Sequence, residues 1–201
     1  MRNTKEEILL EALKLFAKEG YEAVSMRDIA GKLGITQGAL YRHYASKRDI
    51  FESILRRMEE NDRACASEFH VPEKVFSETP EPYRHVVPEE LIQFTLAMFR
   101  YWTENEFASL FRRMLTLEQY RTPKMAALYQ SCLGRGVLLY LEDIFRENGY
   151  DDPGDAALRF YSPFYLLLNQ YDAIDDKSNI VGRLQNHLKG FYHELLQKQI
   201  L

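Results

Sequence analysis

Four helix-start signals lie within the first fifty residues, and they constrain the fold more than any other feature of the chain. Each is a hydroxyl side chain that can accept a hydrogen bond from the first turn of a helix, at Thr4, Ser25, Thr36 and Ser46. Three of these four have an acidic residue three positions later, which completes a capping box. Gly20 and Gly34 stand where the first two helices should end. This spacing predicts a compact unit of short helices.

Apolar residues follow these signals at helical spacing. Leu9, Ala12, Leu13 and Phe16 recur at i, i+3, i+4 and i+7, which predicts a helix over residues 5–19. A second helix of barely two turns precedes Gly34, a third starts after Thr36, and a fourth runs over residues 47–63.

The rest of the chain also reads as helices, after a boundary. Residues 66–90 contain four prolines, which interrupt helices and favour extended backbone. Beyond them the pattern predicts a helical stretch over 89–118 with a break near Asn105, and further helices over 123–148, 156–171 and 177–199. Strand signals are weak throughout.

Charge is distributed unevenly along the chain. The formal net charge is −4, yet residues 25–48 carry five basic residues and one acidic residue. Residues 61–201 carry 15 basic and 20 acidic residues, so an anionic partner should meet the N-terminal part. The two cysteines lack metal-ligand spacing, and no signal-peptide start or long apolar run occurs. We therefore expect a cytoplasmic protein that does not span a membrane.

The segment from Ser25 to Tyr44 fits a helix-turn-helix, in which the second helix enters the DNA major groove with its N-terminal residues toward the base edges. Gly38 has no side chain, so this helix start can approach the duplex closely. Gln37 has the amide that pairs with a base edge. We expect further contacts to bases or phosphates from Arg27, Tyr41, Arg42, His43 and Lys47, and from the backbone amides at the helix starts near Ser25 and Ser46.

The stretch "EALKLFAKEGYEAVSMRDIAGKLGITQGALYRHYASKRDIF", residues 11–51, resembles the DNA-binding domain of the tetracycline-repressor (TetR) family. The resemblance implies an all-helical homodimer with a variable C-terminal domain that binds a ligand and dimerises. It also implies repression that a small molecule relieves. It places the DNA-facing positions on Ser25, Arg27, Thr36, Gln37, Gly38, Tyr41, His43 and Lys47, with Leu40 and Tyr44 on the buried side.

The predicted fold is therefore all-α, with about nine helices in two domains. Residues 1–47 form a three-helix helix-turn-helix DNA-binding domain, and residues 48–65 a connecting helix. A Pro-rich linker over 66–90 leads to a larger C-terminal ligand-binding and dimerisation domain over 91–201.

Aromatic residues and methionines are dense between residues 91 and 171, and buried Tyr and Trp side chains need partners for their polar tips. This predicts a ligand pocket lined by Phe94, Met98, Trp102, Phe111, Tyr129, Tyr161 and Tyr165. A broad apolar stripe in the last helix, together with the apolar residues of 156–171, predicts a pair of helices that packs against a second copy of the chain. The interface residues expected in the last helix are Leu184, Leu188, Phe191 and Leu195. An ordinary intramolecular core is the alternative for that stripe.

These features predict a sequence-specific transcriptional regulator, a repressor released by a small-molecule effector of unknown identity. Its partners would be a palindromic double-stranded DNA operator and a second copy of itself. Two alternatives stay open: an adaptor whose C-terminal domain docks a protein, and a ligand-dependent activator. We expect no enzymatic activity, cofactor or metal, because no catalytic or ligand-spaced cluster occurs; His187 and His193, for example, are six residues apart.

Overall fold

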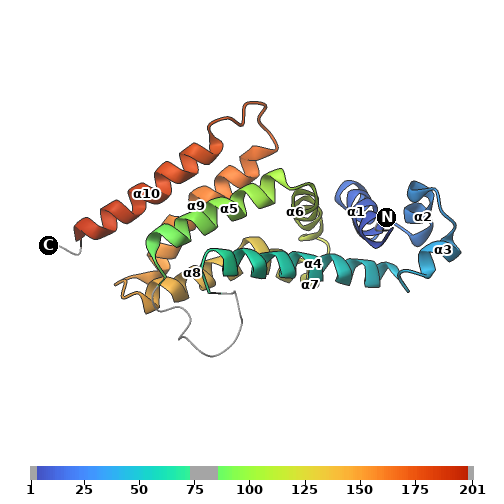
Figure 1. Cartoon of the computed structure of the whole chain (residues 1–201), viewed down its shortest axis with the longest axis horizontal. Coiled ribbons are helices and arrows are strands. Elements are labelled where there is room, and N and C mark those ends of the chain that lie inside the picture. The colour runs from blue at the N-terminus through green and yellow to red at the C-terminus, as the bar shows by residue number, and fades with distance from the viewer. Residues whose placement is uncertain (1–3, 73–85, 199–201) are drawn as a thin grey trace. The chain divides into compact units, whose positions relative to one another are not determined.

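A computed structural model describes residues 4–72 and 86–198, and it omits the side chains of residues 4 and 195–198. Within these residues all regular structure is helical, which confirms the predicted all-α class (Figure 1). The ten helices are α1 (Thr4–Glu19), α2 (Met26–Leu33), α3 (Gln37–Tyr41), α4 (Lys47–Glu68), α5 (Pro88–Glu104), α6 (Glu106–Glu118), α7 (Pro123–Leu133), α8 (Arg135–Glu147), α9 (Pro153–Tyr171) and α10 (Ile180–Lys198).

The chain divides into two compact units, and their composition differs from the predicted domain order. The first unit contains residues 1–61 and 105–129, and the second unit contains residues 62–104 and 130–201. The predicted boundary at residue 91 therefore does not mark the division, because α6 packs against α1 and belongs to the same unit as the N-terminal helices. Of the predicted linker over 66–90, residues 73–85 lie outside the described part of the chain.

The first unit is built around α1, which packs against α2 and α6. One face of α1 is apolar at helical spacing, and its members Ile8, Ala12, Leu13 and Phe16 have no exposed surface. From the facing helices, Ile29, Leu40, Ile50 and Ile54 are equally buried, and α6 contributes Phe107, Ala108, Phe111 and Leu115. This core holds the helix-turn-helix segment in place.

The second unit has an aromatic centre. The rings of Phe145 in α8, Phe160 in α9 and Phe191 in α10 lie with their centroids 5.4 to 5.7 Å apart, each pair inclined rather than stacked. Helix α9 packs against α8, α5 and α10, and α10 also packs along α5 (Figure 1). The Phe99 ring of α5 meets Phe164 edge-on at 5.4 Å.

Several predicted helix boundaries are confirmed, and one is wrong. The predicted break near Asn105 is a helix start, where the Asn105 side chain accepts a hydrogen bond from the Ala108 amide at 3.1 Å. The single helix predicted over 123–148 is instead two helices, α7 and α8, separated at Gly134. At this break the Gln130 side-chain oxygen accepts a hydrogen bond from the Arg135 amide at 3.1 Å, so the first amide of α8 is satisfied by a side chain of α7.

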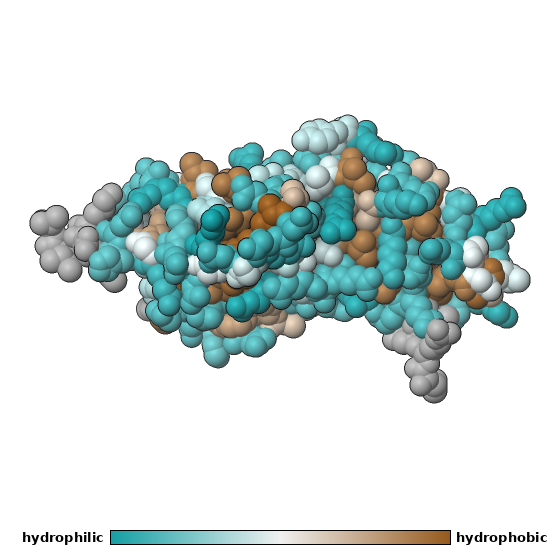
Figure 2. Space-filling view, turned by 90° about the horizontal axis from the view of Figure 1, so that it is seen from above, coloured by the Kyte–Doolittle hydropathy of each residue, from teal (hydrophilic) through white to brown (hydrophobic). Residues whose placement is uncertain are grey.

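The described surface is mixed in character. On the face drawn in Figure 2, hydrophilic residues predominate and hydrophobic residues reach the surface in separate patches. Among the helices of residues 4–72 and 86–198, none combines the length and the apolar character that crossing a lipid bilayer requires.

Candidate nucleic-acid interface

The start of α2 is fixed by the predicted capping box. The Ser25 hydroxyl accepts a hydrogen bond from the Asp28 amide at 3.2 Å, and the Ser25 amide donates to the Asp28 carboxylate at 2.8 Å. The hydroxyl of Ser25 also donates to this carboxylate at 2.6 Å. These hydrogen bonds, first from the side chain and then from the backbone of Ser25, hold the pKa of Asp28 below its usual value. Ser25 is thus exposed, but its side chain already makes the hydrogen bonds of a helix cap.

The turn between α2 and α3 depends on Gly34, as predicted. Gly34 has φ +66° and ψ +27°, in the left-handed region that glycine adopts without strain. The amides of Gly34 and Ile35 donate to carbonyl oxygens in the last turn of α2, that of Ile35 to Ala30 at 3.0 Å. The turn is therefore short and closed, and α3 packs against α2.

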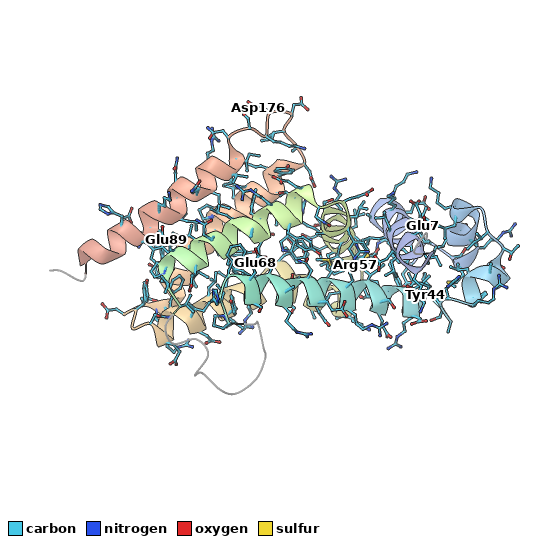
Figure 3. All side chains as sticks on the ribbon, in the orientation of Figure 1. Glu7, Tyr44, Arg57, Glu68, Glu89 and Asp176 are labelled. Atoms are coloured by element: carbon cyan, nitrogen blue, oxygen red, sulfur yellow. The ribbon has the colours of Figure 1, made fainter. Side chains whose placement is uncertain are left out.

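Helix α3 has one buried face and one exposed face. Thr36 caps it, accepting a hydrogen bond from the Ala39 amide at 3.2 Å. Leu40 is fully buried and Tyr44, labelled in Figure 3, is 6% exposed. Burial raises the pKa of the Tyr44 phenol. The exposed side carries Thr36, Gln37, Gly38, Tyr41 and Arg42, with His43 half-buried beside them.

Gly38 has no internal reason to be glycine among the described residues. A Cβ atom built on Gly38 would meet nothing within 4 Å, and its φ is not in the left-handed region. Tyr41, the last residue of this five-residue helix, is 52% exposed. The exposed face of α3 thus combines a bare backbone position with an amide and a phenol.

Lys47 has a structural role that sequence reasoning did not predict. Its ammonium donates hydrogen bonds to the carbonyl oxygens of Tyr21 and Glu22 at 2.8 and 3.2 Å. It also lies 3.8 Å from the Glu22 carboxylate. The phosphate contact of Lys47 stays a prediction. The same side chain already links the α1–α2 connection to the start of α4 through hydrogen bonds.

The other cations of this region are exposed. Arg27 and Arg42 are open to solvent on α2 and after α3. Arg48 pairs with Glu52 of the same helix at 2.7 Å, an ordinary ion pair one turn apart on a helix surface.

The residues predicted to line a ligand pocket fall in both units. Phe111 and Tyr129 belong to the first unit, and the other five belong to the second. Phe94 and Met98 are half-buried, Trp102 and Tyr161 are buried, and Tyr165 is exposed. The Tyr161 hydroxyl donates to the Leu133 carbonyl oxygen at 2.9 Å, so this polar tip has a backbone partner.

The residues predicted for a dimer interface do not form an exposed surface. Leu184 and Leu188 have no exposed area and Phe191 is 3% exposed, because the stripe of α10 faces α5 and α9 of its own chain. The side chain of Leu195 lies outside the described part of the chain. The alternative interpretation, an intramolecular core, describes the three buried residues.

Helix α9, whose apolar residues were predicted to pack with the last helix against a second copy, carries exposed apolar side chains. Leu158, Tyr165 and Leu166 are 53%, 38% and 57% exposed, and they share one helical face with Ser162 and Asn169. The sequence pattern did not single out these three among the many apolar residues of α9.

A short helix, a glycine turn and a second short helix with an exposed polar face define a helix-turn-helix protein. Residues 8–54 match the family model described as bacterial regulatory proteins, tetR family. Over these residues the chain has the DNA-binding segment of this family, which confirms the resemblance seen in the sequence.

Two curated relatives and one solved structure illustrate the similarity. The transcriptional regulator AcrR of Shigella flexneri is 38% identical over 60 residues, which are 30% of this chain and 28% of that protein. The repressor KstR2 of Mycolicibacterium smegmatis is 42% identical over 52 residues, 26% of this chain and 25% of that protein. The match thus spans about a quarter of the length of either relative.

The structural similarity extends further along the chain. SmeT, the repressor of the Stenotrophomonas maltophilia multidrug efflux pump SmeDEF, has a solved complex with triclosan. That structure matches with a TM-score of 0.64 at 18% identity, over 96% of this chain and 91% of SmeT. At this identity the match concerns the fold alone.

Proposed function

We propose that the chain is a sequence-specific transcriptional repressor that binds DNA through α3. The exposed face of α3 carries this proposal: Gly38 leaves the backbone open, and Gln37 and Tyr41 stand beside it. Glutamine pairs with the major-groove edge of adenine, and a phenol can contact a phosphate or a thymine methyl group. Arg27 and Arg42 supply phosphate contacts that position the helix without reading sequence. The relative KstR2 is named a transcriptional repressor, which supports repression rather than activation.

The protein acts in this proposal as a homodimer on a palindromic operator. The exposed side chains of Leu158, Tyr165 and Leu166 support a contact with a second copy, since three large apolar residues share one face of α9. A two-fold dimer places the same face on both sides of the contact. It also places two α3 helices about one DNA turn apart, roughly 34 to 36 Å.

A small molecule bound in the C-terminal part releases the operator in this proposal. The solved complex of SmeT with triclosan supports a small-molecule effector for a protein of this fold. Phe94, Met98, Trp102 and Tyr161 of the second unit are the candidate lining residues. Phe94 and Met98 supply apolar surface, and Trp102 and Tyr161 each add a polar group. An effector that binds the DNA-incompetent dimer more tightly shifts the population away from the operator.

Selection of binding sites from random duplex DNA tests the proposed function. The expected product is an inverted repeat whose half-sites are centred about one helical turn apart, roughly 10 base pairs. A library that shows no enrichment after repeated rounds, with protein shown to be folded and dimeric, would contradict sequence-specific recognition.

A further inference from the structure

A carboxylate from outside the helix-turn-helix holds the turn that precedes it. Glu118, the last residue of α6, accepts a hydrogen bond from the Tyr21 amide at 2.9 Å across 97 residues of sequence. Its side chain is only 1% exposed. A charge so deeply buried requires partners, and its second partner is Arg121, whose Nε lies 3.5 Å away. The carboxylate therefore has a defined place in the first unit.

Gly20 makes the room that this carboxylate occupies. Its φ is +89°, which strains any residue with a side chain. A Cβ atom on Gly20 would also lie 2.7 Å from the Glu118 carboxylate and 2.9 Å from the Arg121 guanidinium nitrogens. The left-handed turn at Gly20 thus does two things: it ends α1, and it exposes the Tyr21 amide to Glu118.

Lys47 binds hydrogen-bond acceptors of the same turn, whereas Glu118 binds a donor. The Lys47 ammonium binds the carbonyl oxygens of Tyr21 and Glu22, while Glu118 binds the Tyr21 amide. The Tyr21 ring packs against Phe16 at 5.2 Å and Phe51 at 5.0 Å. Tyr21 is therefore fixed through its amide, its carbonyl and its ring, four residues before the cap of α2.

Other contacts seat α6 against α1 without reaching this turn. Lys14 lies 3.2 Å from the Glu106 carboxylate at the start of α6. Arg57, labelled in Figure 3, pairs with Glu6 of α1 and stands 4.0 Å from the centroid of the Phe107 ring. The Glu118 side chain, by contrast, accepts a hydrogen bond from the backbone of the α1–α2 connection.

We propose that Glu118 is a positioning residue for DNA recognition, which sets the placement of α2 and α3 by holding the Tyr21 amide. The inference rests on the proposed DNA-binding function. It assigns to α6, far from the helix-turn-helix in sequence, a direct part in presenting the recognition surface. Loss of the carboxylate leaves the Tyr21 amide without its acceptor and the turn free to shift.

Three variants distinguish a positioning role of Glu118 from a contribution to folding stability alone. Glu118→Met keeps the approximate shape but removes the acceptor, whereas Glu118→Gln keeps an oxygen that can accept from the Tyr21 amide. Glu106→Met is the matched control, because Glu106 lies on the same helix and is exposed. For each variant, the affinity for the selected operator and for scrambled DNA is measured by fluorescence anisotropy. Circular dichroism at the same temperature confirms folding.

The expected result is a loss of discrimination. Glu118→Met should lower operator affinity by about tenfold, as expected when a buried hydrogen bond is broken, and change scrambled-DNA affinity by less than about threefold. Glu118→Gln should restore most of the discrimination, and Glu106→Met should retain all of it. Folded Glu118→Met with wild-type discrimination overturns the inference while leaving the proposed function intact.

A second readout needs no DNA. Hydrogen exchange of the Tyr21 amide, followed by NMR in the wild type and in Glu118→Gln and Glu118→Met, reports the hydrogen bond itself. We expect slow exchange in the wild type, faster exchange in Glu118→Met and an intermediate rate in Glu118→Gln. If Glu118→Met does not fold, the wild type and Glu118→Gln decide. Fast exchange of the Tyr21 amide in the wild type, or faster Tyr21 exchange in Glu118→Gln with no loss of operator discrimination, overturns the inference. Failure of the wild type to discriminate operator from scrambled DNA would instead remove the proposed function.

Discussion

The ammonium of Lys47 lies 4.4 Å from the centroid of the Tyr21 ring and donates a hydrogen bond of 2.8 Å to the Tyr21 carbonyl oxygen. One side chain at the start of α4 thus combines a cation–π contact with a charge-assisted hydrogen bond on a turn 26 residues away. This arrangement joins the recognition segment to α1.

Lys47→Met should destabilise the fold while keeping the aliphatic stem. We expect the free energy of unfolding to fall by about 1 to 2 kcal/mol, because the hydrogen bonds of a charged group are lost. Urea denaturation measures this change, with Lys32→Met as the control since Lys32 is exposed on α2. Equal stability of both variants and the wild type would show that the Lys47 contacts contribute nothing.

Gly38→Ala should affect folding and DNA binding in opposite directions. The added methyl group meets nothing within 4 Å, and alanine is favoured over glycine in a helix by up to about 1 kcal/mol. Stability should therefore rise slightly, while operator affinity falls because the methyl group occupies the approach to the duplex. Gly31→Ala is the matched control, also with nothing within 4 Å, and should keep its affinity. Undiminished binding by Gly38→Ala would argue against a close approach at this helix start.

Gly136→Ala should be strongly destabilising. A Cβ atom there would lie 2.5 Å from the Ser131 carbonyl oxygen and 2.8 Å from the Ser131 Cα, which are backbone atoms that cannot rotate away. We expect a loss of about 2 kcal/mol or more in thermal or urea denaturation. Gly154→Ala, whose nearest neighbour would be at an ordinary 3.7 Å, should change stability little. Equal effects of the two substitutions would contradict the tight junction between α7 and α8.

Leu166→Glu should weaken dimerisation without unfolding the subunit. Leu166 is 57% exposed in the single chain, so the subunit core does not need it, but a charge in an apolar two-fold contact is repeated on both copies. Sedimentation equilibrium should show a shift toward monomer, and operator affinity should fall with it. Leu117→Glu, at 46% exposed on α6, serves as control and should remain dimeric. A fully dimeric Leu166→Glu would place the contact elsewhere.

Most of the helix-turn-helix could be predicted from local signals in the sequence. Each of these signals depends on residues within one helical turn, so it can be recognised from neighbouring residues in the sequence. They are the caps at Ser25 and Thr36 and the left-handed Gly34. The structure confirms these three.

Features that depend on distant neighbours were not predictable in the same way. The stripe of Leu184 and Leu188 has the same period whether it faces α5 and α9 or a second copy, and periodicity alone does not name the partner. Glu118 looks like an ordinary acid at a helix end, and only the packing of α6 on α1 buries it beside Tyr21. The break at Gly134 was missed because glycine also occurs inside helices.

Operator binding by Tyr41→Ala separates a DNA-reading surface from an ordinary solvated one. The substitution removes a side chain that is 52% exposed, so the fold should be unchanged, and Tyr120→Ala removes one that is 87% exposed outside the helix-turn-helix. Fluorescence anisotropy with DNA flanking the chain's own gene, and with scrambled DNA, is read at two salt concentrations. We predict that the wild type prefers the flanking DNA and that its binding depends on salt. Tyr41→Ala should weaken the binding free energy for the flanking DNA by about 1 to 3 kcal/mol, and Tyr120→Ala should leave it unchanged. Equal specific binding by the wild type and Tyr41→Ala would contradict recognition through α3.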